Sequence, residues 1–298
     1  MKRSLVGLIL AALLLSGCAA EPSPTQSAAG KIDVVASTNV WGSIAASVGG
    51  AEVSVTSFID DPSKDPHEYE ANAQNQLAIS RAAVVIENGG GYDDFVDTML
   101  KASRSTSIVL NAVEISGLPA PAGGDLNEHV WYDFPTVDKV IDKLESAFAE
   151  ARPAEASVFS ANADTLKGQI ALLVGKESIL KSRYAGVGVA ITEPVPVYML
   201  NAIGLDNKTP GEFSKAIEDG TDASPEVLRQ TLDLYRSHVV KLLAYNEQTT
   251  GAQTDAVLSA AKKNGIAVVP VTETLPTGKT YVAWMSETLD AIGAALAD

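Results

Sequence analysis

Two histidines and three glutamates stand where they could bind a metal ion. His67 and His129 each follow a short apolar run in the first half of the chain, and Glu193 and Glu273 each follow one in the second half. Glu247 also follows an apolar run and qualifies by the same rule. Two neutral imidazole nitrogens with two carboxylates suit a divalent transition metal and offset its charge. The position of these residues after apolar runs therefore suggests one shared metal site.

Taken singly, each of these residues has a simpler explanation. A lone histidine is more often a hydrogen-bonded structural residue, and a glutamate at the end of a strand is more often a solvated surface group. His238, near the end of a helical stretch, favours a structural or surface role because the helix dipole accepts partial positive charge there. The prediction of a metal site therefore depends on the set of side chains meeting in one place.

Seven short apolar runs, rich in valine and isoleucine, alternate with helical stretches. They cover residues 32–37, 53–59, 82–86, 107–112, 187–192, 239–245 and 266–271. Continuous apolar runs of this length indicate strands that are buried on both faces of a parallel sheet, and their alternation with helices predicts an α/β protein. In open parallel sheets ligands bind outside the carboxyl ends of the strands. The polar residues that follow each run are therefore the candidate ligand-binding residues.

One long segment, residues 153–184, has no strand-like run and repeats apolar residues at helical spacing. Pro153 opens it, at a position suited to the first turn of a helix. A helix of about 30 residues would be about 45 Å long, enough to extend along two lobes. We therefore predict an N-terminal α/β lobe at 31–152, a linking helix at 153–184 and a C-terminal α/β lobe at 185–298.

The N-terminus "MKRSLVGLILAALLLSGCAA" reads as an export signal, because two basic residues precede an apolar run too short for a membrane span. Cys18, the one cysteine in the chain, follows "LLSG", which resembles the lipobox of bacterial lipoproteins. We expect residues 1–17 to be a lipoprotein signal peptide and residues 18–30 to be a lipidated cysteine with a flexible linker. An unmodified cysteine at the cleavage site is the alternative.

The chain is acidic, with 22 lysines and arginines against 37 aspartates and glutamates and a formal net charge of −15. This balance argues against a nucleic acid partner, since phosphate binding needs a basic face. It favours cations, although acidity also keeps an exported protein soluble. The sequence contains none of the hydrolase signatures HExxH, GxSxG or a Cys–His pair.

The lipobox, "DPHEYE" after the second run, "EHVWYD" about sixty residues later and the long helix together define a resemblance. The chain resembles the cluster A-I solute-binding lipoproteins, which feed zinc or manganese to ABC importers. The similarity extends from about Lys31 to the C-terminus, and DPHxYE is its most specific element. It implies two lobes with mostly parallel sheets, joined by a long rigid helix, with a metal site in the cleft between them.

The resemblance also implies the ligands. His67 in "DPHEYE" and His129 in "EHVWYD" would be the first two, and Glu193 in "ITEPVPVYML" the third. Family members usually have an aspartate as the fourth ligand, and Glu273 in "VTETLPTGKTYVAWM" occupies that place here with one more methylene. Family precedent makes Glu247 a structural carboxylate.

Other features of the resemblance concern the ion and the groups around it. Asp65 and Glu128 are close to the two histidines in the sequence and could orient the imidazoles. Two histidines with two carboxylates are a harder donor set than three histidines, which favours manganese, although affinity rises toward zinc. Many zinc-specific relatives have a long histidine-rich loop before the second histidine, and this chain has only "LPAPAGGDLN" there. We expect manganese, with zinc a close second and iron also compatible.

The function implied by the resemblance is metal capture outside the cytoplasm. Lipid on Cys18 would anchor the protein to the outer face of the cell membrane, and its partner would be the permease of an ABC importer. One divalent ion would be the transported ligand, cross-linking the lobes, and we expect a monomer without enzymatic activity. Two alternatives remain: a surface adhesin or scaffold, and an exported metalloenzyme in which a glutamate acts as general base beside a metal-bound water.

Overall fold

The computed structural model describes residues 30–61, 69–121 and 126–297. Lys31–Asp298 form one compact unit. We call residues 31–152 the N-terminal half and residues 185–297 the C-terminal half. His67, Asp65 and the N-terminal segment with Cys18 lie outside the described residues, so the predictions made for them stay predictions.

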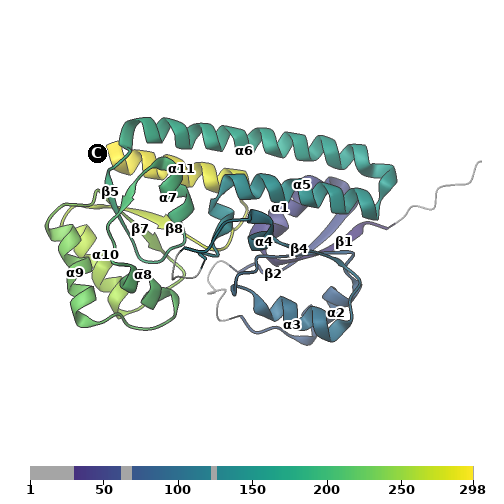
Figure 1. Cartoon of the computed structure of the whole chain (residues 1–298), viewed down its shortest axis with the longest axis horizontal. Helices are drawn as coiled ribbons and strands as arrows, with labels where there is room; N and C mark the ends of the chain where they lie inside the picture. Colours follow the sequence, from purple (N-terminus) through teal and green to yellow (C-terminus); the bar gives the residue numbers. More distant parts are fainter. Residues whose placement is uncertain (1–29, 62–68, 122–125, 298) are drawn as a thin grey trace, which may run out of the picture. The chain divides into compact units, whose positions relative to one another are not determined.

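Each half contains one four-stranded sheet in which every neighbouring pair of strands is parallel (Figure 1). The first sheet has the order β2-β1-β3-β4, with β1 (Ile32–Thr38), β2 (Val53–Ile59), β3 (Val84–Glu87) and β4 (Ile108–Asn111). The second has the order β6-β5-β7-β8, with β5 (Gly188–Ile191), β6 (Asp206–Asn207), β7 (Leu242–Asn246) and β8 (Ala267–Val271). These sheets confirm the predicted α/β class.

Every predicted apolar run overlaps a strand. All residues of β3 and β7 are buried, as continuous apolar runs in parallel sheets require. The run 239–245 begins three residues before β7, since His238 has a left-handed φ of 53° that turns the chain there. No run predicted β6, because its two residues are exposed and polar.

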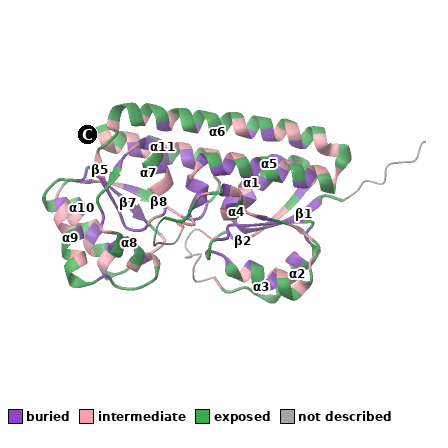
Figure 2. Cartoon of the chain, in the orientation of Figure 1, coloured by how far each residue is buried: buried purple, intermediate pink, exposed green. Residues whose placement is uncertain are grey.

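Helices cover both sheets, with buried residues facing inward and exposed ones facing solvent (Figure 2). The N-terminal half contains α1 (Asn39–Gly49), α2 (Ala73–Arg81), α3 (Asp94–Ser103), α4 (Ala112–Ser116) and α5 (Phe134–Ala151), with 3-10 turns η1 (Gly50–Glu52) and η3 (Val130–Tyr132). The C-terminal half contains α7 (Val197–Ile203), α8 (Gly211–Glu218), α9 (Pro225–Arg236), α10 (Ala252–Lys263) and α11 (Tyr281–Ala297).

The long helix α6 (Ala156–Tyr184) follows the 3-10 turn η4 (Pro153–Glu155). Its 29 residues make it about 44 Å long. It packs against α1 and α5 of the N-terminal half and against α7 and α11 of the C-terminal half (Figure 1). No helix in the described ranges is long and apolar enough to span a membrane.

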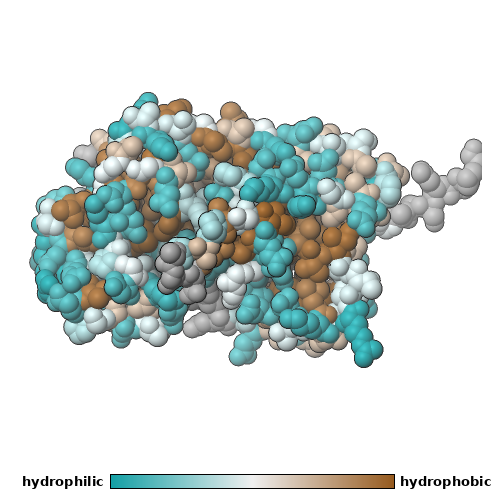
Figure 3. All heavy atoms as spheres, in the orientation of Figure 1, coloured by the Kyte–Doolittle hydropathy of each residue, from teal (hydrophilic) through white to brown (hydrophobic). Residues whose placement is uncertain are grey.

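A single hydrophobic core connects the two halves through α6. One cluster of buried residues contains Val34 in β1, Leu166 in α6 and Leu242 in β7. The outer face of α6 carries exposed apolar side chains as well, such as Leu172 and Ile179, and Figure 3 shows apolar atoms scattered among hydrophilic ones along this edge. Because interiors are closely packed, the shared core resists large movements of one half against the other.

Two leucines of α6 provide a direct test of this packing. Leu166 is 4% exposed and belongs to the shared core, whereas Leu172 is 72% exposed. We expect Leu166→Ala to lower the free energy of unfolding by about 2–5 kcal/mol, as burial and cavity formation require. Leu172→Ala should change it by less than about 0.5 kcal/mol. Urea denaturation measures both, and equal losses would contradict the described orientation of α6.

Candidate metal centre

The structure brings together three of the four predicted ligands. His129, Glu193 and Glu273 are all buried, with His129 at 0%, Glu193 at 3% and Glu273 at 1% exposure. The histidine comes from the N-terminal half, just before η3, and both glutamates come from the C-terminal half. His67, the fourth predicted ligand, lies outside the described residues.

The ring of His129 is held by hydrogen bonding and by aromatic packing. Its Nδ1 lies 2.7 Å from Oδ1 of Asn127, which also accepts the backbone N–H of His129 at 3.1 Å. The amide of Asn127 donates to the carbonyl of Pro194 at 2.9 Å, which makes Oδ1 the acceptor and Nδ1 the protonated nitrogen. Trp131 and Tyr92 pack edge-on against the ring, with centroids at 5.0 and 6.1 Å.

The other nitrogen, Nε2, faces carboxylates from the C-terminal half. It lies 3.4 Å from Oε1 of Glu218 and 3.8 Å from Oε2 of Glu273. Two ligand atoms that each bind an ion at about 2.1 Å are roughly 3.0–3.8 Å apart for bond angles of about 90–130°. His129, Glu218 and Glu128 also each offer a ligand atom within 4.8 Å of the others. These separations suit donors that surround one cation.

The two predicted glutamate ligands meet because β5, β7 and β8 are neighbours in the second sheet. Glu193 follows β5 and Glu273 follows β8, and Asn246, the last residue of β7, lies between them. The Nδ2 atom of Asn246 donates to Oε2 of Glu193 at 2.6 Å and to Oε1 of Glu273 at 2.8 Å. Tyr92 donates its hydroxyl to Oε2 of Glu273 at 3.2 Å. The hydrogen bonds thus extend from the second sheet to the N-terminal half.

The combined effect of burial and neighbouring acidic groups raises the pKa values of Glu193 and His129 in this cluster. Burial raises the pKa of Glu193 to about 8, and the nearby charges of Glu273 and Glu218 add to the shift. For His129, burial lowers the pKa, but Glu218 and Glu273 outweigh it and the net pKa is raised. A bound cation would displace these protons, because metal ligands bind in their deprotonated forms.

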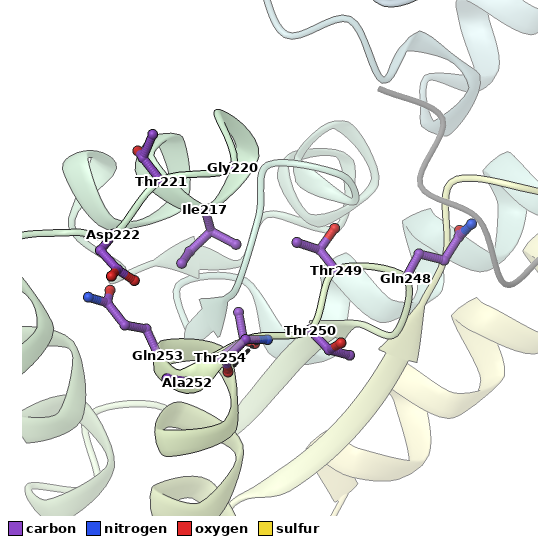
Figure 4. Close-up of a pocket in the computed structure, with 11 residues that line it drawn as sticks. Ile217, Gly220, Thr221, Asp222, Gln248, Thr249, Thr250, Ala252, Gln253 and Thr254 are labelled. Carbon is purple, nitrogen blue, oxygen red and sulfur yellow. Dashed lines mark hydrogen bonds between the residues drawn. The ribbon is translucent and has the colours of Figure 1, made fainter. Parts of the chain in front are cut away.

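A cavity of about 410 Å³ lies beside the cluster, between the segment after α8 and the loop from β7 to α10 (Figure 4). Ile217, Asp222, Gln248 and Thr249 are among its lining residues. His129, Glu193 and Glu273, the predicted ligands that the structure describes, do not line it. The candidate metal centre is therefore the buried cluster and not this cavity.

Several residues of the cluster carried no signal in the sequence. Glu218 ends helix α8, so a rule based on strand ends could not select it. Asn246 stands at a strand end, but the rule selected the acidic neighbour Glu247, which is exposed. His238 is exposed too, in keeping with the surface role proposed for it. The signal for Asn246 would have been an amide at the end of a buried strand, in a sheet where two other parallel strands are followed by glutamates.

The chain matches known proteins over most of its length. The family described as "Zinc-uptake complex component A periplasmic" matches residues 34–295. The manganese-binding lipoprotein MntA of Bacillus subtilis is 24% identical over 275 residues, covering 90% of this chain and 88% of the relative.

Solved structures share the fold. The periplasmic zinc binding protein TroA from Treponema pallidum has a TM-score of 0.74 at 17% identity, covering 90% of this chain and 99% of that chain. A mutant of the laminin-binding adhesin Lmb from Streptococcus agalactiae has a TM-score of 0.76 at 16% identity, covering 89% and 99%.

The raised pKa of Glu193 predicts how the metal-free protein responds to pH. The folded state keeps the proton on Glu193 up to a pH of about 8, from an ordinary value of 4.5, whereas the unfolded chain loses it near that ordinary value. Stability should therefore fall as pH rises from about 5 to about 8. Thermal unfolding in chelator should show a smaller fall for Glu193→Gln. An identical pH profile for this variant would contradict the buried, protonated state of Glu193.

Proposed function

Because the chain belongs to the family of the periplasmic zinc-uptake complex component A, we propose that it captures a divalent transition metal ion outside the cytoplasm and delivers it to an ABC importer. The observation that carries this proposal is the position of Nε2 of His129, which faces carboxylates of the other half at 3.4 and 3.8 Å. A buried imidazole beside buried carboxylates is the donor set of a transition metal site.

We propose His129, Glu193 and Glu273 as ligands, with His67 as the fourth. Glu218 adds a carboxylate within reach of Nε2 of His129, and in the metal-free protein it helps to keep a proton on that ring. On metal binding this proton would leave, and the carboxylate could either join the ion or withdraw from it. Protons and the metal cation would thus compete for the same side chains of the site.

The ion would act as a cross-link between the two halves, in addition to bonds that exist without it. Tyr132 donates its hydroxyl to the carbonyl of Thr272 at 3.0 Å, from the N-terminal half to the C-terminal half. Asn39 exchanges two hydrogen bonds with the backbone of Leu275, at 2.8 and 2.9 Å. With these contacts and the shared core around α6, we infer that binding and release involve only a small tilt of one half.

The identity of the ion is part of the proposal. Two imidazoles with two carboxylates favour manganese compared with a site of three imidazoles, while affinity for nitrogen and oxygen donors rises toward zinc. The manganese-binding lipoprotein and the zinc binding protein named above share the fold or the sequence pattern of this chain. We propose manganese or zinc as the transported ion.

We further propose that Cys18 carries the lipid that holds the protein at the outer face of the cell membrane. The support is the lipobox-like sequence and the description of MntA as a lipoprotein. A monomer that docks on the permease of the importer agrees with this arrangement. The adhesin and metalloenzyme alternatives gain no specific support, since the likeness to the adhesin at 16% identity concerns the fold alone.

Two glutamates at strand ends of the second sheet test the ligand assignment. Glu193→Gln removes a buried carboxylate of the cluster, whereas Glu247→Gln makes the same change at an exposed position. We expect the first variant to lose more than about 100-fold in affinity for manganese and zinc, beyond the loss typical of outer-shell groups. Calorimetric titration should show wild-type affinity for the second. Unchanged affinity in Glu193→Gln would remove this residue from the site.

The bound ion should also stabilise the fold by mass action. At a free concentration about 100 times its dissociation constant, an ion that binds only the native state adds about 2.7 kcal/mol. Thermal unfolding of the wild-type protein should shift upward with added manganese or zinc and return to the metal-free value in chelator. No shift with either ion would count against metal capture.

A further inference from the structure

The cavity of about 410 Å³ beside the metal cluster is lined by both exposed and half-buried residues. Thr221 and Asp222, after α8, and Thr250, in the loop from β7 to α10, are exposed, whereas Gln248 and Thr249 are half-buried. Figure 4 shows Thr221 and Asp222 on one side of the cavity and Thr249 and Gln248 on the other. The cavity therefore leads from solvent toward the interior of the C-terminal half.

One wall of the cavity takes part in the hydrogen bonds around the two glutamates. The hydroxyl of Thr249 accepts from Nδ2 of Asn246 at 3.3 Å, and its side chain is also hydrogen-bonded to Glu193. Oε1 of Gln248 accepts the backbone N–H of Glu273 at 2.6 Å. Thr249 and Gln248 thus have one side toward the cavity and the other toward the metal cluster.

The opposite wall also leads to the cluster. Ile217 and Gly220 line the cavity, and Glu218 stands between them in the chain. Oε1 of Glu218 lies 3.4 Å from Nε2 of His129. An ion that moves inward between the two walls therefore approaches Glu218 on one side and the partners of Thr249 on the other.

The size and the chemistry of the cavity suit a hydrated cation. Six waters at about 30 Å³ each need roughly 180 Å³, which is less than half of the cavity volume of about 410 Å³. Threonine and glutamine side chains of the walls can hydrogen-bond to coordinated waters. Asp222 adds a carboxylate, and none of the described lining residues is basic. These walls attract positive charge and repel anions.

We propose that this cavity is the passage through which the hydrated metal ion travels between solvent and the buried cluster. This inference rests on the proposed function. His129, Glu193 and Glu273 are at most 3% exposed, so an ion needs either a passage or a separation of the two halves. The shared core around α6 and the hydrogen bond from Tyr132 to Thr272 oppose a wide separation. The passage requires only local movement of side chains such as Thr249.

The test narrows the cavity from both walls in the double variant Thr221→Trp with Thr250→Trp, and each single substitution serves as a second variant. Two controls match it. Thr221→Val with Thr250→Val removes the same hydroxyls without adding bulk, and Thr165→Trp adds the bulk at an exposed position of α6. Release of bound manganese or zinc to an excess of a chromophoric chelator gives the dissociation rate constant. Calorimetric titration gives the dissociation constant, and the quotient of the two gives the association rate constant.

We expect both rate constants of the tryptophan double variant to fall together by roughly 10-fold or more, because the ion enters and leaves by the same passage. Its dissociation constant should change by less than about threefold, as for a surface substitution. Both controls should keep the wild-type values. Unchanged rate constants would overturn the proposal, and so would a dissociation constant that rises as far as the association rate constant falls. A wild-type protein that binds neither ion would instead contradict the proposed function, so the two failures are distinguishable.

Discussion

Burial of carboxyl groups around the imidazole of His129 is the constraint on which the rest of the structure depends. Glu193 and Glu273 are almost fully inaccessible, and Glu218 approaches the same ring of His129. Buried carboxylates are tolerated only when they are protonated, hydrogen-bonded or bound to a cation. Glu193 meets this requirement through its raised pKa, which favours the protonated form, and through the hydrogen bond from Asn246. A divalent cation offers the alternative, because its charge replaces the protons.

This constraint explains why the cluster lies between the two halves. A cluster built on one sheet alone would have its ligands at neighbouring strand ends, fixed whether or not an ion is present. Here Glu193 and Glu273 share such an edge, while His129 belongs to the other half. In the proposed site, metal occupancy would be coupled to the distance between the halves, and the shared core around α6 would limit how far that distance can change. A small movement of the ligands on metal binding would therefore shift the two halves slightly and alter any surface that both halves form.

Much of this arrangement could be predicted, because parallel strands follow simple rules. Continuous apolar runs located the buried strands, and the rule of carboxyl ends selected Glu193 and Glu273, which the adjacency of β5, β7 and β8 then brings together. The same rule also selected His129, and the family resemblance implied its role as a ligand. The sequence carried no comparable signal for Glu218, whose position depends on how α8 packs. Asn246 escaped notice because an amide becomes informative only when its two carboxylate partners are known.

The boundaries of the elements were less predictable than their existence, for local reasons. The left-handed turn at His238 delays the start of β7, and the polar strand β6 depends on pairing with β5 rather than on its own apolar residues. A 3-10 turn, η4, takes the place of the first predicted residues of the linking helix. These element boundaries depend on tertiary contacts and on single backbone dihedral angles, and the periodicity of apolar residues predicts neither.

Anomalous diffraction from crystals grown with manganese or zinc tests the central claim most directly. The account predicts one strong anomalous peak at about 2.0–2.2 Å from Nε2 of His129 and from one oxygen each of Glu193 and Glu273, joining the two halves. A peak bound by residues of only one half, or no peak near His129 at saturating metal, would contradict it.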